Sequence, residues 1–413
     1  MRGVIWLVLL FVAAVVAALT LGDNDGLVSF FWGTRRVDMS LNLFLLLALA
    51  AVLALVAGLQ ALNALLSLPR RAREWRELKR ERAAQSALRE ALSEYFGARY
   101  SRAHRAALRA LSIQDAAGVL REDPEFSVQA HLLAAGSLHR LQDRPRRDEQ
   151  LQLALDRVRG NARAVGDGAR LLGAEWALED RNVERAEGLL RELPPGTARR
   201  TQALRLRLQL ARLARQPLEA LHTARLLAKH QAFSRTAAQG LLRSLAADVL
   251  DGAHDADQLR RAWGQMDSAD RRDPVVVAHG ARRAVALGVP EDARQWLRPF
   301  WDALGDVGSD ERTELALALA LACQDIGPEW LPRLEAAQSA WVSEPAVQAA
   351  VGHAFAARGL WGKARRPLEN AAKHPELDSA ARRHAWRALA ALAREQGDDQ
   401  RALDCERAGA ALD

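Results

Sequence analysis

The sequence predicts an all-α protein in which an N-terminal two-helix transmembrane hairpin is followed by a TPR-like α-solenoid. Two long apolar runs near the N-terminus predict the hairpin, because about 20 apolar helical residues cross a hydrocarbon core of roughly 30 Å. Through the remaining chain, apolar residues three and four apart predict helices, and small residues recurring at the tetratricopeptide period predict stacked helix pairs. The predicted domains are the hairpin at 1–69, a basic juxtamembrane helix at 70–92 and a cytoplasmic TPR-like repeat domain at 93–413.

The two predicted spans cover residues of about 4–21 and 41–66 and enclose a loop at 22–40. A cleavable signal peptide is the alternative for the first span, because Arg2 precedes an apolar run. That run is long, however, and no clear small-x-small cleavage site follows it. We therefore expect both segments to stay in the membrane.

The orientation of the spans follows from charge. The chain has a formal net charge of +7, and a short stretch after the second span holds seven cations against three acids. Because cations beside a span resist translocation, we expect this stretch and both termini in the cytoplasm of a multi-pass inner-membrane protein. Membrane lipids, and no nucleic acid, are the expected partners of this lipid-facing basic stretch, which consists of Arg70, Arg71, Arg73, Arg76, Lys79, Arg80 and Arg82.

The loop at 22–40 is expected to lie in the periplasm, and two structures suit it equally. Residues 27–32 and 35–40 flank Gly33 and Thr34, a pattern typical of a small β-hairpin. Alternatively, Phe30, Phe31 and Trp32 anchor an interfacial loop, because aromatic side chains favour the membrane–water boundary.

The repeat pattern is clearest from residue 345 onward, where a small residue, a turn glycine and a second apolar stripe follow one another. Ala186 and Ala220 are 34 residues apart, which is the TPR period. An ordinary irregular helical bundle is the alternative, because alanine-rich amphipathic helices imitate this spacing. The residues predicted to pack the repeats are Ala186, Ala220, Gly280, Ala293, Gly352, Phe355, Trp361, Ala364, Trp386 and Ala402.

No catalytic motif is present. The sequence lacks a P-loop, a GxGxxG after a strand, an HExxH, a GxSxG and a paired-cysteine metal site. Its only cysteines, Cys323 and Cys405, are far apart, which indicates a reducing compartment without disulfides. We therefore expect no enzyme activity, no cofactor and no bound metal.

Histidines offer one alternative. His131 and His139, like His222 and His230, are eight residues apart and lie near one helical face. Such a pair suits a metal or haem site, although single histidines are more often capping or core-edge residues.

A binding groove is the sharper hypothesis. In TPR arrays the first helix of each pair lines a concave groove, where arginine forks suit carboxylates. Arginine is abundant throughout this chain, so part of the enrichment arises by chance. The predicted groove residues are Arg205, Gln209, Arg212, Arg282, His353, Arg387 and Arg394.

Taken together, the two spans, the short loop, the arginine-rich exit helix and the TPR-like region resemble the proteobacterial HemY family of haem-biosynthesis-associated membrane proteins. The segments at 91–107, 131–135 and 206–212 look like their counterparts there. The resemblance implies a non-catalytic inner-membrane scaffold that organises haem-pathway enzymes, its expected partners, through TPR-mediated contacts. Two alternatives are a carrier with haem or a porphyrin as its ligand, and a membrane-anchored TPR regulator of lipopolysaccharide assembly.

Overall fold

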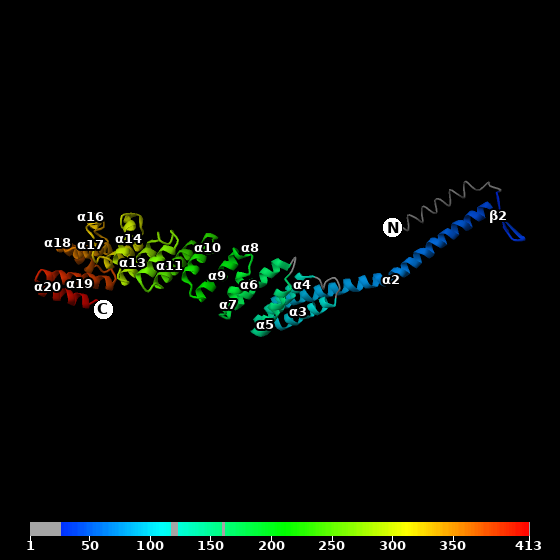
Figure 1. The fold of residues 1–413 in the computed structure, drawn as a ribbon, viewed down its shortest axis with the longest axis horizontal. Coiled ribbons are helices and arrows are strands. Elements are labelled where there is room, and N and C mark those ends of the chain that lie inside the picture. The colour runs from blue at the N-terminus through cyan, green and yellow to red at the C-terminus, as the bar shows by residue number, and fades with distance from the viewer. Residues whose placement is uncertain (1–25, 117–122, 159–161, 413) are drawn as a thin grey trace. The chain divides into compact units, whose positions relative to one another are not determined.

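The computed structural model describes residues 26–116, 123–158 and 162–412. Within these ranges the chain is helical, apart from one two-stranded antiparallel sheet and the connecting turns (Figure 1). The prediction of an all-α fold is therefore confirmed. The first predicted span, at about 4–21, lies outside the described residues.

A β-hairpin precedes the first described helix. Strand β1 (Leu27–Trp32) pairs with β2 (Arg35–Ser40) so that Leu27 lies opposite Ser40. Gly33 has a φ of 60°, which suits glycine at the first central position of a two-residue turn. Of the two structures that suited this segment, the hairpin is the one observed.

Helix α2 (Leu41–Phe96) is capped by Ser40, whose hydroxyl accepts a hydrogen bond from the Leu43 amide at 3.4 Å. Its first 22 residues, Leu41–Leu62, are long and apolar enough to cross a membrane, and they are not buried by other parts of the protein. The helix then continues without a break through 70–92, the segment expected to form the basic juxtamembrane helix. The predicted second span and the basic stretch are thus parts of one helix.

The chain divides into two compact units, Met1–Gln150 and Leu151–Asp413. In the first, the later half of α2 packs against α3 (Tyr100–Asp115) and α4 (Pro124–Arg140), and α5 (Arg144–Asp156) begins here. Alanines dominate these contacts, and small side chains let helix backbones approach closely. The buried clusters contain Ala84, Ala87, Ala91, Ala106, Ala107, Ala110, Phe126, Ala130 and Ala134.

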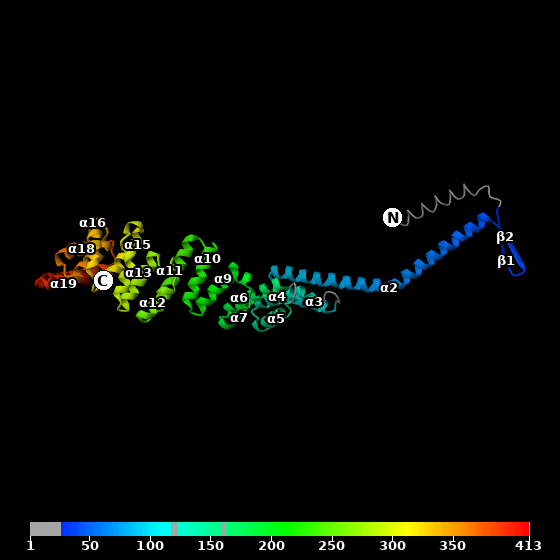
Figure 2. The ribbon, with the colours of Figure 1, turned by 45° about the horizontal axis from the view of Figure 1, so that its top comes forward.

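The second unit is an array of helices, each packed beside its neighbours along the chain (Figure 2). Its helices are α6 (Arg163–Glu179), α7 (Val183–Arg191), α8 (Pro195–Ala198), α9 (Thr201–Leu213), α10 (Pro217–Lys229), α11 (Arg235–Asp251), α12 (Ala256–Gln265), α13 (Pro274–Ala286), α14 (Pro290–Trp301), α15 (Ser309–Leu321), α16 (Leu331–Ala340), α17 (Pro345–Ala357), α18 (Trp361–Lys373), α19 (Ser379–Glu395) and α20 (Asp399–Ala410), with short 3₁₀ turns at Leu304–Asp306 and Pro328–Trp330.

Most turns within helix pairs share one backbone feature, a residue in the left-handed region, which the turn between α11 and α12 lacks. Between α13 and α14 it is Gly288 (φ 76°), between α17 and α18 Gly359 (φ 69°), and between α19 and α20 Gly397 (φ 75°). Arg181 and Arg215 take the same conformation, at 57° and 54°, in the turns before α7 and α10. A left-handed residue ends a helix abruptly, so the same tight helix-turn-helix unit recurs.

Ion pairs connect successive helix pairs of the second unit, and their partners are separated by a constant number of residues along the chain. Arg282 pairs with Glu314, Arg312 with Glu344 and Glu369 with Arg401, and each pair is 32 residues apart. A constant separation means that equivalent positions of neighbouring units meet, which is the property of a repeat-like helical array.

The predicted packing residues lie in this array. Gly352 on α17 faces Leu368 on α18, and Gly280 on α13 faces the Trp263 ring. Trp361 and Trp386 are partly buried. The fully or almost fully buried members are Ala186, Ala220, Ala293, Phe355, Ala364 and Ala402.

Candidate functional site

Four successive first helices, α13, α15, α17 and α19, line a cavity of about 330 Å³. We call it the first-helix groove. Its polar groups are Arg282, Glu314, His353, Asp378 and His384, and its apolar wall is formed by Leu317, Ala320, Leu321, Ala349, Ala380 and Ala381. Each of four successive helix pairs contributes one helix, so the groove crosses the boundaries between these pairs.

A cation and an anion stand side by side at the α13–α15 edge of the groove. The Arg282 guanidinium forms an ion pair with the Glu314 carboxylate and also donates to the Glu314 main-chain oxygen at 3.4 Å. Both side chains keep more than a third of their surface exposed. The pair is therefore accessible to a partner and contributes little to stability itself.

Two imidazoles stack at the α17–α19 edge. The ring centroids of His353 and His384 are 3.8 Å apart, with planes inclined by 19°. Burial lowers the pKa of His353 to about 3, with a smaller effect from His384. The pKa of His384 is lowered as well, by burial and then by the Arg387 charge, so both rings are neutral near pH 7 and offer one donor and one acceptor each.

Asp378 closes the groove at the start of α19. Its carboxylate accepts a hydrogen bond from the Ala381 amide at 2.6 Å, which is an N-cap. One carboxylate oxygen of Asp378 is thus occupied by the cap of its own helix. Together the five polar groups can bind a mixed-charge, hydrogen-bonding segment of another molecule.

The groove unites two of the residues predicted for it, Arg282 and His353. Arg387 lies beside it on α19, close enough to influence His384. Arg205, Gln209 and Arg212 are exposed on α9, and Arg205 donates to the Ala232 oxygen at 3.5 Å. Arg394 is exposed and pairs with Glu406 on α20.

Glu314, Asp378 and His384 also line the groove but were not predicted from the sequence. A signal existed for His384, because it follows His353 by 31 residues, close to one repeat. Glu314 follows Arg282 by 32 residues. A search for charged or imidazole groups one period apart would have found both.

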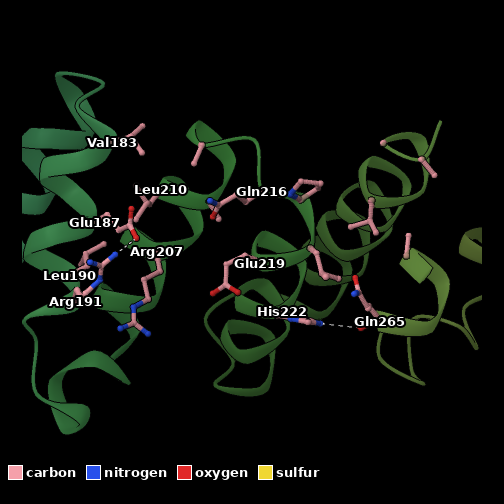
Figure 3. Close-up of a pocket in the computed structure, with 18 of the residues that line it drawn as sticks. Val183, Glu187, Leu190, Arg191, Arg207, Leu210, Gln216, Glu219, His222 and Gln265 are labelled. Atoms are coloured by element: carbon pink, nitrogen blue, oxygen red, sulfur yellow. Dashed lines mark hydrogen bonds and ion pairs between the residues drawn. The ribbon is translucent and has the colours of Figure 1, made fainter. Parts of the chain in front are cut away.

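A second cavity, of about 720 Å³, lies between α7, α9, α10 and α12 (Figure 3). Glu187 pairs with Arg191 at one wall, and the His222 ring lies 3.4 Å from the Gln265 oxygen at the other. Arg207 and Glu219 reach into the space between the walls. None of the predicted groove residues lines this cavity.

Nothing in the described ranges gathers three or more histidine, cysteine or acidic side chains where a metal ion could bind. His131 contacts Gln150 at 2.9 Å and His139 contacts Arg147 at 3.5 Å, whereas His230 ends α10. Cys323 and Cys405 are buried free thiols. Burial raises the pKa of Cys323 to about 12, which keeps this thiol unreactive at neutral pH.

The basic stretch is described in part. Arg80 donates to the Ala116 oxygen at 3.0 Å, and the Lys79 ammonium lies 5.2 Å from the centre of the Trp75 ring. Trp75 is 62% exposed, a placement that suits an aromatic side chain at a membrane surface. Arg70, Arg71 and Arg73 lie outside the side chains that the structure describes.

These features define a class: a repeat-like helical protein with a polar groove on its first helices and, within the described residues, one helix suited to crossing a membrane. Residues 26–140 match the family model of the HemY protein N-terminus. This match supports the resemblance to the HemY family, and it points to an association with haem biosynthesis and with a membrane. No curated protein matches the chain.

Proposed function

We propose that this protein is a non-catalytic membrane scaffold that recruits enzymes of haem biosynthesis through TPR-type contacts in the first-helix groove. The observation that carries the proposal is the combination, in one chain, of the HemY N-terminal domain with a groove built by successive first helices. TPR-type arrays bind extended or helical segments of partners along such surfaces.

The chemistry of the groove favours binding over catalysis. Its ion pair and its two neutral imidazoles can exchange hydrogen bonds with a partner's main chain and polar side chains. The two cysteines are buried elsewhere, so the groove holds no thiol nucleophile. A partner segment with alternating charges would match the order cation, anion, imidazole along the groove.

The apolar part of α2, Leu41–Leu62, would hold bound enzymes at the membrane. A scaffold held by the apolar part of α2 keeps bound enzymes near the bilayer and near one another. Tethering raises effective concentrations to about the millimolar range for short linkers. Intermediates then pass between neighbouring enzymes without a catalytic group on the scaffold.

Site-directed photocrosslinking in native membranes tests the proposal. The photoreactive residue benzoylphenylalanine replaces Leu321, which lines the groove, or Leu403 on α20 as a control. Both leucines are helical and similarly exposed, at 45% and 46%, so the variants differ in location and little else. Enzymes of haem biosynthesis should be captured at Leu321 and not at Leu403.

Equal capture at both positions would refute recruitment through the groove. Capture of proteins of lipopolysaccharide assembly alone would instead favour the regulator of envelope assembly. An Arg282→Ala, Glu314→Ala double variant should reduce specific capture severalfold while leaving the helical content unchanged, because a pair with more than a third of its side-chain surface exposed contributes little to stability.

A tetrapyrrole carrier remains the second candidate because two imidazoles, the side chains that most often ligate haem iron, meet in the groove. Visible-range titration of the full chain in detergent with haem separates the candidates. A carrier shows stoichiometric binding that is lost on His353→Gln with His384→Gln and kept on His254→Gln, an exposed residue outside the groove. A scaffold shows no saturable change.

A further inference from the structure

The β-hairpin at the start of α2 has two chemically different faces. Side chains alternate across a strand, so the register of β1 and β2 sorts them into two sets. One face carries Ser29, Arg36 and Asp38, together with Leu27, Phe31 and Ser40. The other carries only apolar side chains up to the tip, where Arg35 lies beside the turn; its apolar members are Val28, Phe30, Trp32, Val37 and Met39.

The polar face is organised by its own hydrogen bonds. Arg36 donates to Asp38 at 2.8 Å and to the Ser29 hydroxyl at 3.2 Å, and that hydroxyl donates to Asp38. These two donors lower the pKa of Asp38, which keeps it charged. The guanidinium of Arg36 also lies 5.6 Å from the centre of the Phe31 ring. The network keeps a charged pair in water on this side.

The apolar face is largely uncovered. At its base the Phe30 ring packs against Phe44 of α2, with centroids 5.6 Å apart. Farther out, Val37 is 52% exposed and Trp32 is 88% exposed. An apolar surface that begins on the hairpin is therefore continuous, through Phe30 and Phe44, with the apolar part of α2.

The hairpin is tied closely to that helix. Strand β2 runs directly into the Ser40 cap, and the Leu41 amide donates to the Gly26 oxygen at 2.8 Å. No linker separates the two, so the hairpin stays at the end of the helix that is suited to crossing a membrane.

The hairpin suits neither bulk water nor the hydrocarbon core, which leaves the membrane–water boundary as the environment that fits both of its faces. A two-stranded hairpin is marginal in water by itself, and its unpaired strand edges exclude it from the hydrocarbon core, where main-chain groups find no partner. The boundary between headgroups and acyl chains supplies water for the edges and an apolar medium for one face, and it is where tryptophan concentrates.

We propose that the hairpin is a lipid-binding element that lies on the bilayer surface, with the face of Phe30, Trp32 and Val37 against the acyl-chain boundary and the Ser29–Arg36–Asp38 face toward water. Its ligand is the phospholipid surface itself. The hairpin then fixes the depth at which α2 enters the membrane.

Depth-dependent quenching tests this assignment. Cysteine is introduced by Val37→Cys on the apolar face, by Ser29→Cys on the polar face one rung away, or by Leu53→Cys within the apolar part of α2. The native cysteines are buried, so a fluorescent thiol label reports the new site. The full chain is reconstituted in vesicles of phosphatidylethanolamine and phosphatidylglycerol, with nitroxide-bearing lipid or aqueous iodide as the quencher.

The label at Val37 should be quenched by nitroxide lipid about threefold more than the label at Ser29, with iodide giving the reverse order, because the two faces meet different media. Equal quenching of the two hairpin labels would overturn the proposal. Protection of Val37 from both quenchers would overturn it as well and would indicate a protein partner. Loss of lipid quenching at Leu53 would overturn the membrane span on which the element depends.

Discussion

At the scale of single residues, His353 is a polar side chain of the groove that is almost completely buried from solvent. Only 7% of its surface is exposed, and its ring lies against His384. Burial of an imidazole penalises its charged form. At mildly acidic pH the folded protein therefore keeps His353 neutral, whereas the unfolded chain protonates it.

This difference predicts a pH-dependent stability. The pKa of His353 is about 3 in the folded chain against an ordinary value of 6.5. Because the folded value is the lower one, the stabilising contribution is complete above pH 6.5 and is lost as the pH falls toward 3. Between pH 7 and pH 5 the free energy of unfolding should fall by about 2 kcal/mol more in the wild type than in His353→Gln.

Urea unfolding followed by circular dichroism at several pH values measures this effect. The neighbouring charged and titratable groups, Arg282, Glu314, Asp378, His384 and Arg387, are unchanged in the variant. His254→Gln removes an exposed histidine and should keep the wild-type pH dependence. Parallel curves for the wild type and His353→Gln would contradict the prediction.

Gly352 on α17 gives a second prediction. A Cβ atom at this position would lie 2.7 Å from Cγ of Leu368 and 3.1 Å from the Leu368 main-chain nitrogen. Gly352→Ala should therefore lower the free energy of unfolding by about 1–3 kcal/mol, although alanine is the better helix former. The matched control is Gly188→Ala on α7, where nothing lies within 4 Å and a gain of up to about 1 kcal/mol is expected. Thermal melting of both variants decides, and equal shifts would contradict the close approach.

At the scale of helices, Arg312 on α15 connects neighbouring units. It pairs with Glu344 at 2.8 Å, donates to the Leu304 and Val307 oxygens at 3.2 and 2.9 Å, and lies 4.0 Å from the centre of the Trp341 ring. Its side chain is 11% exposed. One arginine thereby satisfies main-chain groups before α15 and a carboxylate before α17.

Removing this arginine should cost more than removing an exposed one. Arg312→Ala is expected to lower the free energy of unfolding by about 3 kcal/mol, because a largely buried carboxylate and two carbonyls lose their donor. Arg312→Lys should be intermediate, since lysine lacks the planar fork. Arg394→Ala, which breaks an exposed Arg–Glu pair, should cost less than about 1 kcal/mol. Denaturant melts with equal losses at both arginines would show that the inter-unit contact is unimportant.

Local patterns predicted the elements well. The turn at Gly33 and the pattern around it suited a hairpin and an interfacial loop equally, and the hairpin is observed. The glycine turns at 288, 359 and 397 lie where left-handed residues are needed. The non-glycine turns at Arg181 and Arg215 gave no such signal, because tertiary packing imposes their conformation. The predicted second span and the predicted basic helix form one continuous helix, which runs from an apolar into a charged sequence.

At the scale of the whole molecule, the groove was predictable only in part. Arg282 and His353 were assigned to it because each lies on a first helix, and both line it. Arg205 and Arg212 were chosen by the same rule, yet they are exposed on α9 outside this cavity. A helix position fixes which face a residue occupies. Which faces meet in one cavity depends on how units with eroded spacing pack, and a single sequence does not specify that.

The orientation of the chain is the remaining prediction at this scale. Cations close to the cytoplasmic end of a span resist translocation, and Arg76, Lys79, Arg80 and Arg82 follow the apolar part of α2 on the same helix. A green fluorescent protein fused after residue 413 should therefore fluoresce, and alkaline phosphatase at the same site should be inactive. Alkaline phosphatase fused after Gly33, in the hairpin turn, should be active, because residues 1–33 include the first predicted span.

Replacing the cations of the basic stretch with glutamine should weaken the preference for a cytoplasmic C-terminus and raise the phosphatase activity of the C-terminal fusion. An active phosphatase at the unaltered C-terminus would place the groove outside the cytoplasm and would exclude recruitment of cytoplasmic enzymes there.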